Sequence, residues 1–91
     1  MRKLDEKFHI EGDKIIKTSN GAEIPADEPV FLFRGRDRLA IKALIYYREI
    51  SAADGCNDYH FEHLEKDIEA FRRFAVDHPD RMKQPSITRG K

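Results

Sequence analysis

Alternating arginines form the clearest chemical feature of the chain, in the stretch Arg34-Gly35-Arg36-Asp37-Arg38. A helix N-terminus attracts anions through its unpaired N–H groups and its positive dipole end, and arginine binds phosphate oxygens bidentately. Gly35 would let the backbone approach a ligand closely. The stretch predicts an anion site, for a nucleotide or another phosphorylated messenger, at Arg34, Gly35, Arg36 and Arg38. It is not a P-loop motif. The alternative is that the arginines pair with acidic side chains of the same chain while Asp37 caps the helix.

Cys56, His60 and His63 are the second group that could do chemistry. Zinc binds these ligand types, and a cysteine next to a histidine can act as a nucleophile. Structural zinc sites usually draw on two separated pairs of ligands, however, and only one short cluster is present here. No third group orients a Cys–His pair. We therefore interpret the three as a half-buried cysteine and two solvated histidines, and predict no metal, no cofactor and no catalytic residue.

Aromatic and basic side chains supply a third candidate, an interface. Tyr46 and Tyr47 are adjacent, so on a helix they point about 100° apart and cannot both enter one core. Phe74 falls outside the main apolar stripe of its own predicted helix. The last residues of the chain carry basic charge without acidic residues. We predict an interaction surface at Tyr46, Tyr47, Phe74, Arg81 and Lys83.

The elements that position these residues are predicted to be strands first and helices second. Short apolar or alternating runs at 8–10, 14–18, 22–24 and 30–34 are typical of strands, and Gly12 and Gly21 mark turns between them. The run at 30–34 is nearly all apolar and lacks glycine and proline, so it predicts the strongest strand.

The helical half of the chain has two periodic segments. From Asp37, apolar residues recur at helical spacing to Ile50, in a stripe wider than one buried face needs. A second helix is predicted from Asn57 or Asp58 to about Asp77, ended by the proline that follows.

The predicted fold class is α+β: a small antiparallel β-meander of three to four short strands followed by two packed α-helices. The expected organisation is a frayed N-terminus over residues 1–6, a single α+β domain over 7–80 and an extended basic tail over 81–91.

Composition narrows the function classes. The 91 residues include 17 basic and 17 acidic side chains, a net charge of zero, and one cysteine. No apolar run is long enough for a membrane span or a signal peptide, and one cysteine permits no internal disulfide. We expect a cytoplasmic protein without membrane contact. The neutral charge argues against general nucleic-acid binding, and the acidic second helix argues against sequence-specific DNA binding.

The stretch Ile24-Pro25-x-Asp27-Glu28-Pro29-apolar-Phe31, followed by Arg34-x-x-Asp37, resembles short bacteriophage and prophage accessory proteins of uncharacterised activity. The similarity covers about residues 14–80. It implies an accessory protein in the host cytoplasm that binds a host component, including components of host defence, and it brings no catalytic motif.

These observations together predict a small non-enzymatic binding protein that acts through a protein–protein interface. The expected partners are a host protein, a second copy of the chain in a homo-oligomer, or both. The alternative is a small-ligand binder that holds a nucleotide or another phosphorylated messenger at the Arg34–Arg38 junction.

Overall fold

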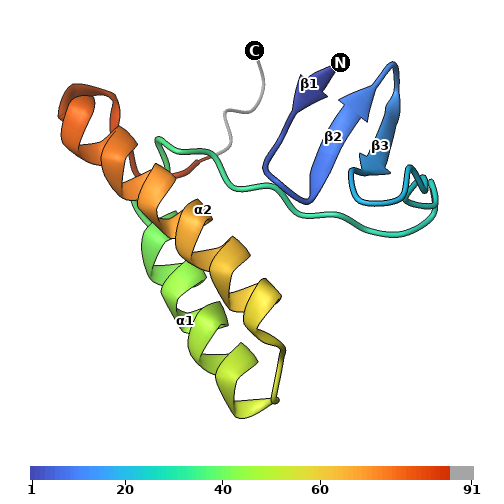
Figure 1. Cartoon of the computed structure of the whole chain (residues 1–91). Helices are drawn as coiled ribbons and strands as arrows, with labels where there is room; N and C mark the ends of the chain where they lie inside the picture. Colours follow the sequence, from blue (N-terminus) through green and yellow to red (C-terminus); the bar gives the residue numbers. More distant parts are fainter. Residues whose placement is uncertain (87–91) are drawn as a thin grey trace. The chain divides into compact units, whose positions relative to one another are not determined.

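The computed structural model describes residues 1–86. It contains a three-stranded antiparallel sheet followed by two α-helices, which confirms the predicted α+β class (Figure 1). The chain divides into two compact units, an N-terminal unit over Met1–Phe31 and a helical unit over Leu32–Lys91. This division differs from the expected single domain over 7–80 and tail over 81–91. Residues 87–91 of the predicted tail lie outside the described residues.

The sheet of the N-terminal unit is a meander in the order β1-β2-β3. Its strands are β1 (Arg2–Lys3), β2 (Phe8–Glu11) and β3 (Lys14–Lys17). The expectation of a frayed segment over 1–6 is wrong at β1, where Arg2 pairs with Ile10 and Lys3 with His9. A local side-chain contact makes this possible. The Asp5 carboxylate accepts hydrogen bonds from the N–H groups of Lys7 and Phe8, at 2.8 and 2.9 Å, and so holds the turn into β2.

Two side chains form the buried centre of this unit, Ile16 and His9. Gly12 has a φ of +62° in the tight turn between β2 and β3, a backbone conformation that favours glycine. His9 Nδ1 lies 2.9 Å from Thr18 Oγ1, and His9 Nε2 lies 2.6 Å from Glu11 Oε2. The buried imidazole is therefore hydrogen-bonded at both nitrogens, as burial of a polar ring requires.

The predicted strand at 30–34 is wrong. Residues 30–34 form no strand, and Phe31 is 81% exposed. The sheet is built from residues before 25, because residues 22–24 lie along the outer edge of β3 and β1 lies along the other side of β2. Ile24 N–H donates to Ile15 O at 2.9 Å, and the predicted strand at 22–24 is reduced to a single bridge. Apolar composition favours a strand, but an available edge decides whether one forms.

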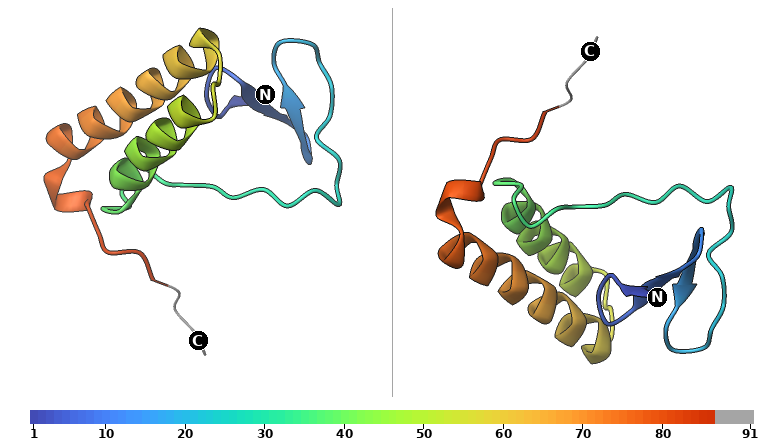
Figure 2. Two further views of the ribbon diagram at one scale, coloured as in Figure 1. Left: turned by 90° about the horizontal axis from the view of Figure 1, so that it is seen from below. Right: turned by 90° about the horizontal axis from the view of Figure 1, so that it is seen from above.

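The helical unit consists of α1 (Ala40–Ala53), α2 (Asp58–Asp77) and a 3₁₀ helix (Pro79–Arg81). The two α-helices lie side by side along their length (Figure 2). The buried residues of this unit are Ala40, Ser51, Leu64 and Ile68. Among the described residues, neither helix combines the length and apolar character that a membrane span needs.

The ends of the helices follow from local chemistry. Gly55, at φ +77°, lies in the turn after α1, and the Asn57 side chain accepts a hydrogen bond from His60 N–H at 3.0 Å at the start of α2. The predicted bounds of α2 are confirmed. Helix α1 begins three residues after Asp37, because the Asp37 carboxylate accepts from Leu39 N–H in a turn that precedes the helix.

Candidate binding surface

Two basic segments that are distant in sequence are joined by backbone hydrogen bonds in the helical unit. Arg38 N–H donates to Lys83 O at 2.9 Å, and Lys83 N–H donates to Arg36 O at 2.8 Å. The result is a short parallel bridge between Asp37 and Lys83. The segment after α2 therefore runs beside the segment that leads into α1. We call the cations that these segments carry the basic cluster: Arg34, Arg36, Arg38, Arg81 and Lys83.

The cations of the basic cluster are mostly exposed. Arg36 is half-buried and the other four cations are exposed. Within residues 32–86, the ion pairs are formed by other side chains, and none joins Arg34, Arg38 or Lys83 to a carboxylate. Within the helical unit, these arginines therefore do not pair with the acidic side chains of α2. The cluster is available to an external anionic group.

The backbone N–H groups directly before α1 are not free to bind an anion. The N–H groups of residues 37–40 already donate to acceptors of the chain itself. Asp37 N–H donates to Arg34 O at 3.0 Å, and Leu39 N–H donates to the Asp37 carboxylate at 2.8 Å. An anion at the basic cluster would thus be recognised mainly by side chains. This arrangement differs from sites in which free helix N–H groups hold a phosphate.

Gly35 serves packing in this structure. A Cβ atom at Gly35 would lie 3.3 Å from Cγ of Phe74, so the absence of a side chain lets the ring pack directly against the backbone. The same ring contacts His78, with centroids 4.9 Å apart, and the Arg81 guanidinium lies 4.7 Å from its centroid. Phe74, predicted as an interface residue, is half-buried within this packing.

The adjacent tyrosines have different surroundings. Tyr47 makes an edge contact with His60, with ring centroids 5.7 Å apart, and is 50% exposed. Tyr46 is 64% exposed and lies on the side of α1 that also presents Leu39 and Ile50. The sequence predicted an excess of apolar surface on this helix. It did not show which apolar side faces α2, because both sides have the same residue types.

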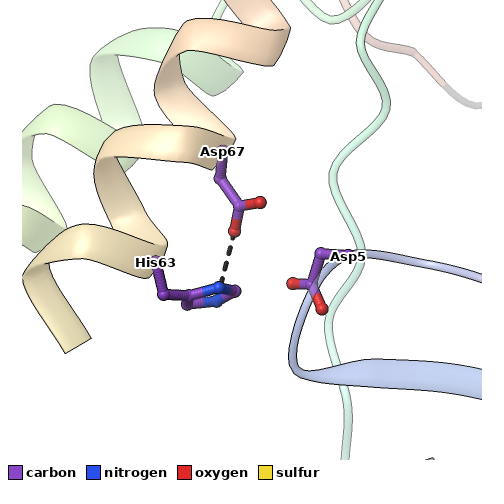
Figure 3. Close-up of side chains that lie close together, drawn as sticks. All are labelled: Asp5, His63 and Asp67. Carbon is purple, nitrogen blue, oxygen red and sulfur yellow. Dashed lines mark ion pairs between the residues drawn. The ribbon is translucent and has the colours of Figure 1, made fainter. Parts of the chain in front are cut away.

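The residues considered for metal binding or nucleophilic chemistry are not brought together in the described part of the chain. His60 Nε2 lies 3.1 Å from the buried Ser51 Oγ, which links α2 to α1. His63 Nε2 instead pairs with Asp67 on α2 at 3.3 Å (Figure 3). Cys56 is half-buried in the turn between the helices, where its N–H donates to Ser51 O.

The acidic side chains of α2 take part in surface ion pairs. Arg48 on α1 pairs with Glu65, and Arg73 pairs with Glu69 at 3.6 Å within α2. Pairs of this kind are worth a few tenths of a kcal/mol when exposed. They are typical of a solvated helix face.

Comparison of the chain with protein-family models, curated proteins and solved structures found no significant match. The residues of the chain itself therefore provide the grounds for a function.

Proposed function

We propose that this protein is a non-enzymatic binding protein that recognises an acidic surface of another protein through the basic cluster. The observation that carries the proposal is the backbone bridge between Asp37 and Lys83, which brings two segments that carry cations side by side. Unpaired surface cations accelerate association with an acidic partner and exclude basic ones.

A protein partner fits the geometry better than a phosphorylated small ligand. A small anion is usually held by several convergent donors, including backbone N–H groups. Here the N–H groups of residues 37–40 are occupied, and four of the five cations have exposed side chains. Exposed cations spread over two segments match an extended acidic surface.

The resemblance to bacteriophage and prophage accessory proteins suggests the setting for this binding. In that setting the partner is a host protein in the host cytoplasm, and a component of host defence is one candidate. The protein would act by occupying its partner's surface, without chemical turnover.

The test uses the full chain as bait in a bacterial lysate, in three forms. The first is the wild type, and the second is Arg34→Glu/Lys83→Glu, which reverses two charges of the basic cluster. The third is the control Arg72→Glu/Arg73→Glu, which makes the same change of charge on α2 outside the cluster. We expect the wild type and the control to capture the same protein, and the cluster variant to bind it at least about tenfold more weakly.

Two results would contradict the proposal. One is equal capture by all three forms, and the other is no capture by the folded wild type at low salt. Calorimetry against a panel of mono-, di- and cyclic nucleotides tests the alternative, in which the basic cluster binds a phosphorylated small ligand. Heat that is present for the wild type and absent for Arg34→Glu/Lys83→Glu would favour a phosphorylated ligand over a protein partner.

A further inference from the structure

The exposed side of α1 has the spacing of a helix–helix contact. Its apolar residues follow one another at intervals of four, three, four and three positions, and we call them the α1 seam: Leu39, Ala43, Tyr46, Ile50 and Ala53. Leu39 is 51% exposed and Ile50 47%. An alternation of three and four is the seam of a coiled coil, because it keeps the apolar side chains facing one partner helix over successive turns.

The α1 seam is separate from the contact between α1 and α2. The buried residues are Ala40 and Ser51 on α1 and Leu64 and Ile68 on α2, and Ser51 Oγ lies 3.1 Å from His60 Nε2 of α2. On a helical projection, the line of Leu39, Tyr46 and Ile50 lies roughly 100° or more from Ala40 and Ser51. Helix α1 therefore has two apolar sides, of which α2 covers one.

Charged residues beside the seam indicate what covers the other side. Lys42 and Glu49 are exposed, lie seven positions apart and share one flank of the seam. The opposite flank carries Ala40 and Tyr47 at the corresponding positions. In an antiparallel pair of identical helices, each flank of the seam faces the same flank of the other helix. In a parallel pair, each flank faces the opposite flank of the other helix. In a parallel pair Lys42 would face Tyr47, and Glu49 would face the like charge of Asp54, so only the antiparallel arrangement gives Lys42 and Glu49 oppositely charged partners.

We infer that a second copy of this chain covers the seam, with the two α1 helices antiparallel about a twofold axis near Tyr46. Lys42 of each copy then lies beside Glu49 of the other, so one pair of residues provides two equivalent ion pairs. Such self-complementarity is what a twofold contact requires. With α2 behind each α1, the dimer is a four-helix arrangement.

This inference goes beyond the binding proposed above and concerns a different surface. The seam runs along the side of α1, and the basic cluster precedes the helix and follows Pro79. Each can therefore fail without the other. A dimer would present two basic clusters to a partner, which raises the effective strength of binding to a repeated acidic surface.

Light scattering and sedimentation of the full chain test the dimer. We expect the wild type to be a dimer, and Tyr46→Glu to be a folded monomer because two carboxylates would meet at the twofold axis. The matched control is Tyr59→Glu, since Tyr59 is an 82% exposed tyrosine on α2 outside the seam, and we expect this variant to remain dimeric. Circular dichroism establishes that each variant is folded.

Exchanging the charges of Lys42 and Glu49 tests whether the two α1 helices are antiparallel. Lys42→Glu and Glu49→Lys should each weaken the dimer, about three- to tenfold in Kd, since each places like charges together at two places. The double variant Lys42→Glu/Glu49→Lys should regain the wild-type Kd. The inference is overturned if the wild type is monomeric up to about 0.5 mM, or if Tyr46→Glu remains a dimer. A double variant as weak as the single ones overturns the antiparallel arrangement.

Discussion

Gly35 and Phe74 illustrate how one residue without a side chain shapes the candidate surface. The ring of Phe74 lies against the Gly35 backbone on one side and contacts Arg81 and His78 elsewhere. Phe74 is therefore a shared neighbour of Gly35 and Arg81, although Arg81 belongs to the segment after α2. A glycine between arginines suggests ligand approach, and in the structure Gly35 makes room for the Phe74 ring.

We predict that Gly35→Ala lowers the free energy of unfolding by about 1 kcal/mol. The added Cβ would lie 3.3 Å from Phe74 Cγ, and the contacts of the ring with Arg81 and His78 oppose its displacement. Chemical denaturation of the full chain measures the change.

The control is a double-mutant cycle with Phe74→Leu, which removes the ring that the Cβ would meet. In that background Gly35→Ala should be neutral or stabilising, because alanine restricts the unfolded chain more than glycine does. An equal loss in both backgrounds would show that the Phe74 contact is not the cause.

Among the elements, α2 depends most on signals within its own sequence. Asn57 satisfies an N–H of the first turn, and Pro79 follows the last residues of the helix. Apolar residues at intervals of three and four place Leu64 and Ile68 on the buried face. Helix α1 has no side-chain cap of its own at Leu39 and has apolar residues on two sides, so its bounds and its buried face were harder to predict.

We predict that Asn57→Ala destabilises the chain by about 1 kcal/mol, since the His60 N–H in the first turn loses its side-chain acceptor and keeps only the longer bond to Asn57 O. Asn57→Asp should retain most of the stability, because a carboxylate accepts the same hydrogen bond and interacts favourably with the helix dipole. Thermal and urea denaturation of both variants measure the difference. Equal losses in the two variants would contradict a capping role for Asn57.

For the whole molecule, the contact that matters most to the candidate function is the bridge between Asp37 and Lys83. It joins the segments on either side of the helix pair, and with them the cations of the basic cluster. It rests on two backbone hydrogen bonds, so its persistence can be measured directly.

We predict that the amide protons of Arg38 and Lys83 exchange with solvent more slowly than that of Gln84, which follows the bridge. Lys83→Pro removes the N–H that donates to Arg36 O, and it should speed exchange at Arg38 and weaken partner capture. Lys83→Ala retains the N–H, so it should preserve the slow exchange at Arg38 while removing one charge. Equally fast exchange at all three amides in the wild type would contradict a persistent bridge.

The features that could be predicted from the sequence depend on local interactions. The α+β order, the bounds of α2 and the turn at Gly12 depend on spacing, capping and backbone conformation within a few residues, and these are visible in the sequence. The strand expected at 30–34, the position of Gly35 and the joining of the basic segments depend on partners far along the chain. A strand at 30–34 would need hydrogen-bonding partners from another strand, and Lys83 bonds Arg36 and Arg38 from the far side of both helices in the sequence. Tertiary structure decided these features because each needs a non-local partner, whose identity residue type alone does not specify.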